Sequence, residues 1–201
     1  MSNLKETILN PILKGNPITV LILGICSSLA VTVELKGAIV MALSVTIVTG
    51  LSSYVCSLLR KTIPNRVRII VQLVVVALMV IVVDQFLKAY SYTIEKQLSV
   101  YIGLIITNCI VMGRIEAYAL GNKPLPSLLD GLANGLGYGI ILVIVAFFRE
   151  LFGSGTLFGV PVLSAIGYTN NGLVILPPFA LILLGCIIWI QRSIQKDLQE
   201  K

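Results

Sequence analysis

Histidine is absent from this chain of 201 residues. It is the commonest metal ligand and the side chain whose charge changes nearest neutral pH, so its absence excludes any Ser-His or His-metal mechanism built within the chain. Charged residues are also scarce, at 12% of the sequence against about 25% in a typical soluble domain. The four cysteines are therefore the only thiolate ligands that the chain offers to a soft metal.

Apolar residues dominate instead, because 57% of the chain is hydrophobic and the mean hydropathy is +0.98. This composition indicates an integral membrane protein in contact with the lipid bilayer. No cleavable signal peptide is expected, since the first seventeen residues carry Glu6 and Pro11 and no separate apolar core. The net charge of +6 does not indicate nucleic acid, because the basic residues stand at the ends of apolar segments.

Six apolar segments follow one another, at residues 18–33, 37–59, 66–87, 98–112, 131–152 and 173–190. The first and fourth have only sixteen and fifteen residues, about 24 Å of helix, which is short of the roughly 30 Å hydrocarbon core. Two short segments at matching places are typical of an inverted repeat with a site at its centre. The sequence predicts an all-α integral membrane protein, a single polytopic domain over residues 1–201, with six transmembrane segments. They form two inverted three-helix repeats, about 1–90 and 98–191, with segments 1 and 4 short or broken.

Each short segment contains one cysteine near its middle, Cys26 in the first and Cys109 in the fourth. Buried cysteine often acts as a small hydrophobe, and a disulfide between the two is a further alternative. Their matched placement among small polar neighbours favours a site instead. Two thiolates cannot complete a four-ligand iron–sulfur or zinc centre, so a second chain would have to supply the others. Cys56 and Cys186 are expected to pack in the core.

Asp84 is the sharpest acidic signal, because it adjoins a run of valine and isoleucine and intramembrane acids often mark ion paths. The alternative is an interfacial anchor that pairs with Lys88 one turn later. The remaining charges near segment ends, including Arg149 beside Glu150 and Arg114 near Glu116, are expected at the membrane interface.

Three further patterns concern the ends and faces of the segments. Asn16 followed by Pro17 predicts the cap and first residue of a helix for segment 1. Gly131, Gly135 and Gly139 have the four-residue spacing of a helix-packing face. If all six segments cross, eleven lysines and arginines share the side of both termini and four lie toward the other, so both termini are expected in the cytoplasm.

Several stretches carry a resemblance to a known family: residues 16–17, 24–32, 64–70, 83–85, 106–114, 130–131 and 148–155. The most specific is the run Thr-Asn-Cys-Ile-Val-Met-Gly-Arg at residues 107–114. The chain resembles the membrane subunits of the sodium-translocating NADH:quinone oxidoreductase (Nqr) and Rnf electron-transport complexes, and is most similar to the D-type subunit of Nqr. The resemblance covers nearly the whole chain.

The resemblance implies a six-segment fold with inverted repeats and a homologous partner, the E-type subunit, of opposite orientation in a six-subunit complex. In that family each partner supplies two cysteines to a [2Fe–2S] cluster, and Cys26 and Cys109 stand at the matching positions. The chain would relay electrons between flavins across a bacterial inner membrane, coupled to Na⁺ export. FMN, FAD, NADH and ubiquinone would be bound by other subunits.

Other functions remain open at this stage. The Rnf homologue would use the same electron relay for ferredoxin and NAD⁺. A secondary transporter also fits an inverted repeat with broken helices, although few intramembrane polar residues are available for a substrate. A membrane scaffold is the simplest alternative, and it predicts that both cysteines tolerate alanine.

Overall fold

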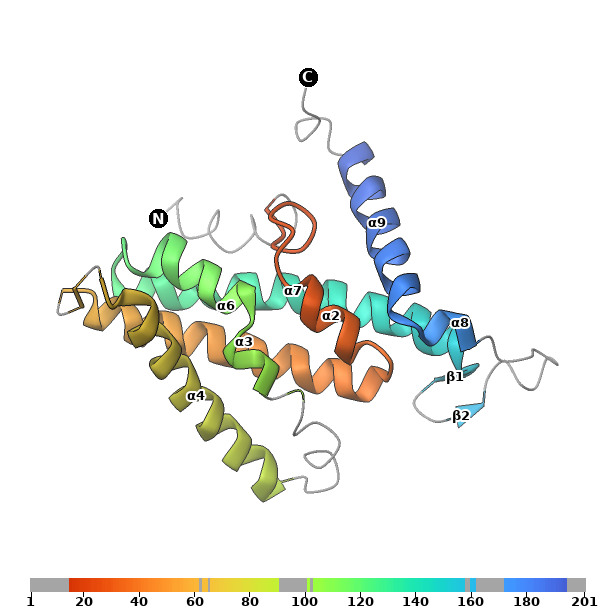
Figure 1. The fold of residues 1–201 in the computed structure, drawn as a ribbon, viewed down its shortest axis with the longest axis horizontal. Coiled ribbons are helices and arrows are strands. Elements are labelled where there is room, and N and C mark those ends of the chain that lie inside the picture. Colours follow the sequence, from red (N-terminus) through yellow and green to blue (C-terminus); the bar gives the residue numbers. More distant parts are fainter. Residues whose placement is uncertain are drawn as a thin grey trace.

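The computed structural model describes residues 15–61, 63–64, 66–90, 101, 103–157, 160–161 and 172–194 (Figure 1). Their elements are α2 (Ile25–Val31), α3 (Leu35–Leu59), α4 (Arg68–Tyr90), α6 (Cys109–Arg114), the π-helix η1 (Ile115–Ala119), α7 (Pro124–Gly153), β1 (Thr156–Leu157), β2 (Val160–Pro161), α8 (Gly172–Ile175) and α9 (Pro177–Ile194). The two strands form one short antiparallel pair. The helical class is as predicted.

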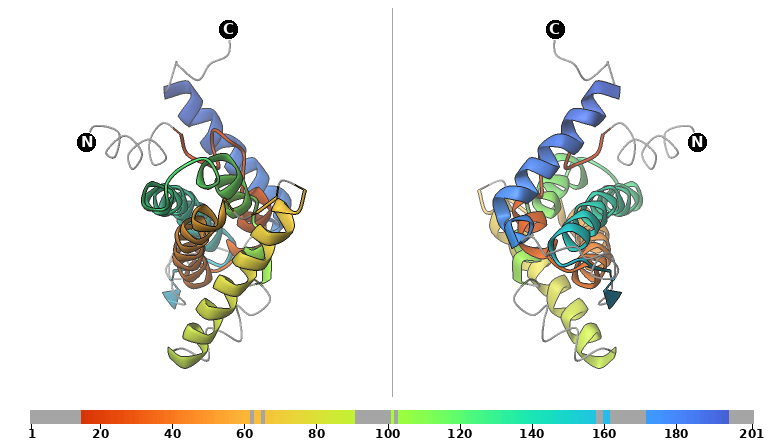
Figure 2. Two further views of the ribbon diagram at one scale, coloured as in Figure 1. Left: turned by 90° about the vertical axis from the view of Figure 1, so that its left-hand side faces the viewer. Right: turned by 90° about the vertical axis from the view of Figure 1, so that its right-hand side faces the viewer.

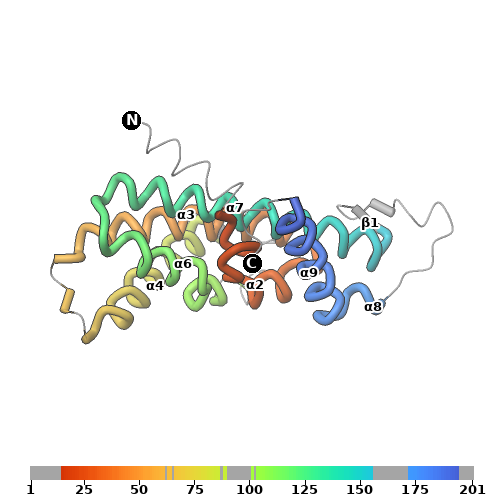
Figure 3. The backbone as a smooth tube through the Cα atoms, turned by 90° about the horizontal axis from the view of Figure 1, so that it is seen from above, coloured from red at the N-terminus to blue at the C-terminus, as the bar shows by residue number. Residues whose placement is uncertain are grey.

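The centre of the molecule is an antiparallel pair of helices, α3 and α7, which lie side by side in all views (Figures 1 and 3). The pair approaches closely because a row of glycines on α7 faces α3. A Cβ on Gly135 would lie 2.6 Å from Thr46 Cα, and one on Gly131 would lie 2.8 Å from the Thr49 carbonyl oxygen. Gly139 continues the row, so the predicted glycine packing face is confirmed.

Helices α4 and α9 leave the central pair in different directions (Figures 1 and 2). Both expose large apolar side chains, including Ile69, Leu78 and Phe86 on α4 and Ile182 and Trp189 on α9. Among the described residues, four helical stretches are long and apolar enough to span a membrane: Leu35–Leu59, Arg68–Phe86, Pro124–Gly153 and Pro177–Ile194. Such exposed apolar surface is expected where lipid or another membrane chain replaces water.

Segment 1 is interrupted more than the sequence predicted. Asn16 Oδ1 accepts a hydrogen bond from the Ile18 amide at 3.0 Å, but residues 17–20 form turns rather than the expected regular helix. Positive φ angles at Ile22 (56°) and Gly24 (85°) break the helical hydrogen-bond ladder. Regular helix begins at Ile25, so this expectation about the segment's start is wrong. Its description as short or broken is confirmed.

Segment 4 is also broken. Residues 103–106 are helical, a turn interrupts the helix at residues 107–108, and α6 then begins at Cys109. Residues 98–100 and 102 lie outside the described residues. Helix α6 continues directly into the π-helix η1, so the hydrogen-bond pattern of the backbone changes once more at Ile115.

The remaining segment ends differ modestly from the prediction. Helix α7 starts seven residues before Gly131, because Pro124 occupies the first helical position, where its missing N–H costs nothing. Segment 6 divides at Leu176 into α8 and α9, as expected for a chain that then meets Pro177 and Pro178. A turn at Ser154 and Gly155 follows α7.

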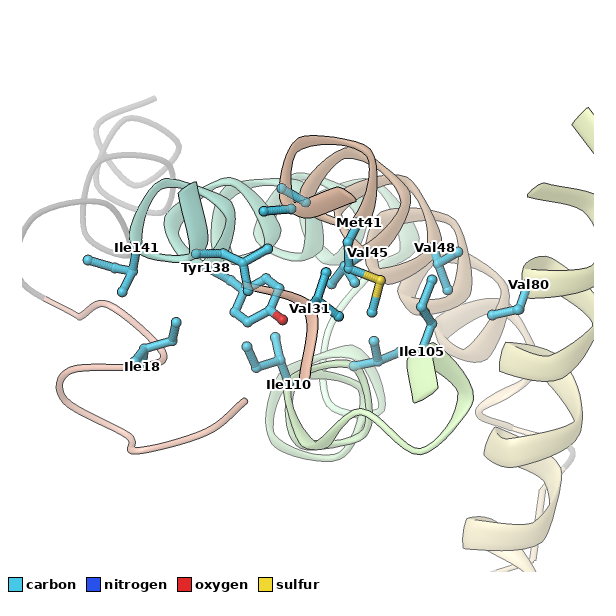
Figure 4. Packing of buried hydrophobic residues seen from close by; sticks show 14 of the residues in the cluster. Ile18, Val31, Met41, Val45, Val48, Val80, Ile105, Ile110, Tyr138 and Ile141 are labelled. Atoms are coloured by element: carbon cyan, nitrogen blue, oxygen red, sulfur yellow. The ribbon is translucent and has the colours of Figure 1, made fainter. Parts of the chain in front are cut away.

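The hydrophobic core lies between the α3–α7 pair and the two broken segments (Figure 4). Tyr138 projects from α7 into this core beside Ile110 and Val31 (Figure 4). Cys56 is fully buried on α3, which confirms its predicted packing role.

Candidate functional site

Cys26 and Cys109 each lie in the first turn of a short helix. Cys26 is the second residue of α2 and Cys109 the first residue of α6. The amide of Gly24, two residues before Cys26, donates a hydrogen bond to Cys109 Sγ at 2.9 Å. The two broken segments, 85 residues apart at this contact, therefore meet at their cysteine-bearing ends.

The backbone at Gly24 depends on glycine for two reasons. Its φ of 85° is one that L side chains rarely adopt. A Cβ there would also lie 2.6 Å from Ile110 Cδ1 and 3.0 Å from Tyr138 Cε2. Only glycine lets the amide approach the Cys109 sulfur so closely.

All four cysteines are free thiols, so the disulfide alternative is absent from the structure. Cys26 is exposed and Cys109 is partly buried, which leaves both thiols near the surface of this chain. Cys186 is exposed on α9, so the expectation that it packs in the core is wrong. Helix α9 diverges from the central pair (Figure 1), and its residues Gly185 and Cys186 are exposed.

A small polar network lies beside the two cysteines. Ser27 Oγ is 2.7 Å from the Tyr138 hydroxyl, and Asn108 Nδ2 donates to Ser27 Oγ at 3.4 Å. All three side chains are at least 95% buried. Ser27 and Asn108 are the neighbours of Cys26 and Cys109 and belong to the small polar residues noted in the sequence, whereas Tyr138 was not predicted, because it stands within the glycine row of α7. Its hydroxyl, flanked by two glycines, was the available signal.

Arg149 is the largest fully buried side chain of the described residues. It was expected as a charge at the membrane interface, and it lies near the end of α7 with 1% of its surface exposed. Its Nη1 donates to the Leu29 carbonyl at 3.1 Å and to Thr32 Oγ1 at 2.5 Å, near the end of α2. Its other nitrogens donate to the carbonyls of Val174 and Ile175 in α8. Arg149 thus connects the end of α2 to α8.

Glu150, the next residue of α7, is also buried within the chain. Its Oε2 accepts a hydrogen bond from the Leu35 amide at 2.6 Å, at the first residue of α3. A carboxylate at this position satisfies one of the amides left free at a helix start and complements the helix dipole. Neighbouring residues of α7 therefore fix both α2 and α3.

The charges near Arg114 form two groups at the other end of α7. Arg114 donates to both carboxylate oxygens of Asp130, at 3.0 and 2.6 Å, and Asn134 Nδ2 donates to the same carboxylate at 3.1 Å. Glu116, in the π-helix, accepts from Gln72 Nε2 at 2.8 Å and pairs with Arg68. These contacts join η1 to α4 and α6 to α7.

Asp84 pairs with Lys88, as the anchoring alternative predicted. Lys88 Nζ lies 2.8 Å from Asp84 Oδ2, and the Asp84 side chain is 19% exposed. No group of three or more His, Cys, Asp or Glu side chains close enough to hold a metal occurs within the described residues. Cys26 and Cys109 have thiol side chains of the kind that ligate iron–sulfur clusters, and a four-thiolate site would need two further thiols.

These features define a helical membrane protein in which two interrupted segments bring cysteine-bearing helix starts together. The model of one membrane-protein family, described as "Rnf-Nqr subunit, membrane protein", matches residues 4–188. The chain belongs to this family, which confirms the resemblance found in the sequence.

Three relatives, each named as the D-type subunit of a Na(+)-translocating NADH-quinone reductase, show the same likeness. The protein from Haemophilus influenzae (strain PittGG) is 57% identical over 201 residues, which cover 98% of this chain and 97% of the relative. The protein from Serratia proteamaculans is 54% identical over 202 residues, with 98% and 97% covered. The protein from Pseudomonas paraeruginosa is 54% identical over 198 residues, with 96% and 89% covered.

Proposed function

We propose that this chain is the D-type membrane subunit of a Na⁺-translocating NADH-quinone reductase in a bacterial inner membrane. The names and near-complete coverage of the relatives support the complex, and favour it over an Rnf complex. As a component of that enzyme the chain contributes to electron transfer coupled to sodium export. NADH, flavins and quinone are handled by other subunits.

The residues proposed for this role are Cys26 and Cys109, as two ligands of a [2Fe–2S] cluster completed by a homologous partner, the E-type subunit. The observation that carries the proposal is the 2.9 Å hydrogen bond from the Gly24 amide to Cys109 Sγ, because it brings the two cysteine segments together. The partly exposed thiols also suit ligands shared with a second chain. When bound, such a cluster accepts and donates single electrons.

The remaining elements support a pseudo-symmetric arrangement of six segments. Each broken segment is followed by a long helix, α3 after α2 and α7 after η1, and these two long helices pack antiparallel. An inverted repeat relates its halves in this way. In the proposed arrangement, residues of about 1–90 and 98–191 form the two halves, and the shared centre lies between them and the partner.

The proposal is tested by purifying the chain anaerobically with its partner and measuring iron and acid-labile sulfide. We expect about two irons and two sulfides per pair. Cys26→Ala and Cys109→Ala should each lose them, since a cluster with three thiolates is poorly held. Cys186→Ala is the matched control, because it removes an exposed thiol on α9 far along the chain from both sites.

An intact pair without iron would reject the electron-transfer role and revive the transporter and scaffold alternatives. Uptake of a solute by this chain alone in liposomes would then favour a transporter. Equal iron loss in Cys186→Ala and Cys26→Ala would show that cysteine removal acts through general destabilisation, and the assignment of ligands would fail.

A further inference from the structure

The hydrogen bonds around Ser27 fix the direction of every donor in the polar network. Ser27 Oγ is 3.1 Å from the Gly24 carbonyl oxygen, which can only accept, so the single Ser27 hydroxyl proton is used there. The Tyr138 hydroxyl, 2.7 Å away, must then donate to Ser27 Oγ. Asn108 Nδ2 donates to the same oxygen at 3.4 Å, which fills its second lone pair.

Asn108 has its orientation set independently. The Ile110 amide donates to Asn108 Oδ1 at 3.1 Å, so the other side-chain atom must be the nitrogen that reaches Ser27. Asn108 therefore caps the helix that begins with Cys109 and also reaches the helix that carries Cys26. The network ties both cysteine-bearing helix starts to Tyr138, which is fully buried on α7.

Gly24 is the point at which this network meets the sulfur. Its carbonyl accepts from Ser27, and its amide donates to Cys109 Sγ at 2.9 Å. Tyr138 also contacts Gly24 closely, since a Cβ at Gly24 would lie 3.0 Å from the Tyr138 ring. Tyr138 and Ser27 thus hold the Gly24 backbone in the position from which its amide reaches the sulfur.

We infer that Tyr138, Ser27 and Asn108 are positioning residues that aim the Gly24 amide at the Cys109 sulfur and thereby raise the reduction potential of the redox centre held there. An N–H donor to a ligating sulfur stabilises the more negative, reduced form, so a lost or misaligned donor lowers the potential. The inference rests on the proposed function, because it concerns the same cysteine.

The test is a redox titration of the anaerobic pair, followed by electron paramagnetic resonance, with Tyr138→Phe and Ser27→Ala. Tyr138→Phe removes one hydroxyl and leaves the ring that packs against Gly24. At a fixed potential we expect the oxidised-to-reduced ratio to rise about two- to tenfold, and tenfold is about 59 mV for one electron. Iron and sulfide should stay at the wild-type content.

Tyr54→Phe is the matched control, because Tyr54 lies on α3, is 37% exposed and takes part in none of the hydrogen bonds of this network. A wild-type pair without iron would reject the proposed function itself. If the wild-type pair holds a cluster and its reduction potential is the same in Tyr138→Phe, Ser27→Ala and Tyr54→Phe, only this inference is overturned.

If Tyr138→Phe fails to fold, the reduction potential of Ser27→Ala tests the inference instead. Iron loss in both variants would also overturn it, since the network would then hold the centre rather than tune it.

Discussion

Arg149 shows how a single side chain can organise a membrane protein from the inside. Its guanidinium is buried, yet each of its three nitrogens donates to an acceptor at the end of α2 or in α8. Lysine would be a poor replacement, because its ammonium lacks the planar fork that reaches several acceptors at once. Arg149 therefore matters more for the placement of α2, and with it Cys26, than for membrane orientation.

Replacement of Arg149 by methionine should lower the melting temperature of the detergent-solubilised chain. The carbonyls of Leu29, Val174 and Ile175 would lose this donor, and an unsatisfied acceptor costs about 1–3 kcal/mol where it is buried. We expect a decrease of at least about 5 °C, with Arg149→Lys intermediate. Arg192→Met, on an exposed position of α9, should change it little. Equal melting of Arg149→Met and wild type would contradict this account.

Asp84, unlike Arg149, has a partner that is close in sequence, and this contact favours one of its two predicted roles. Its charge is balanced by Lys88 one helical turn away, which favours an anchor at the end of α4. We therefore expect Asp84→Asn to leave the sodium dependence of pumping unchanged in the complex, as Lys88→Gln should. Slower pumping by Asp84→Asn at low sodium, with normal pumping by Lys88→Gln, would instead assign Asp84 to an ion path.

At the scale of elements, the contact between α3 and α7 depends on the absence of side chains. The glycine row of α7 gives the two backbones room to approach each other. The helices of the broken segments, by contrast, are too short to be stable without tertiary contacts. Helix α2 has seven residues and α6 has six, so neither is stable alone. Their order comes from contacts with the central pair.

Gly135→Ala should destabilise the folded chain by about 1–3 kcal/mol, because the new Cβ would lie 2.6 Å from the Thr46 backbone. Gly185→Ala is the control: it lies within α9 and its added Cβ would meet nothing within 4 Å. Alanine there should raise helix stability by roughly 0.5–1 kcal/mol. Thermal unfolding in detergent measures both. Similar effects of the two substitutions would show that close α3–α7 packing is not what Gly135 provides.

At the scale of the whole molecule, α3 has the length to separate two aqueous compartments. Its 25 residues span about 38 Å, more than a hydrocarbon core. Lys36 and Lys61 lie at its two ends and both are exposed. The distribution of basic residues predicts that the Lys61 end faces the cytoplasm, together with both termini.

An impermeant maleimide should therefore label Lys36→Cys in spheroplasts and Lys61→Cys in inverted vesicles. Wild type provides the background from the native thiols, and Lys36→Ser with Lys61→Ser controls for loss of the lysines. Labelling of Lys61→Cys in spheroplasts would reverse the proposed orientation. Labelling of both positions from one side would show that α3 does not cross the bilayer.

The long helices were predictable from sequence because a membrane demands long uncharged runs. Residues 37–59 predicted α3 almost to its ends, and the glycine spacing of segment 5 predicted the face that α3 covers. The shortness of segments 1 and 4, and a cysteine in each, were also visible in the chain. These features are local, since they depend on how many apolar residues stand between polar ones.

Only the tertiary structure decided which partners the buried polar side chains contact. Nothing local distinguishes Arg149 from a charge at a membrane boundary, because its acceptors belong to α2 and α8, distant in sequence. The same holds for Tyr138, whose partner Ser27 is 111 residues away. The sequence by itself determined that the protein enters a membrane and which two of its segments are short or broken. Only the fold determined which amide meets the Cys109 sulfur, because that contact joins backbone from one broken segment to a side chain of the other.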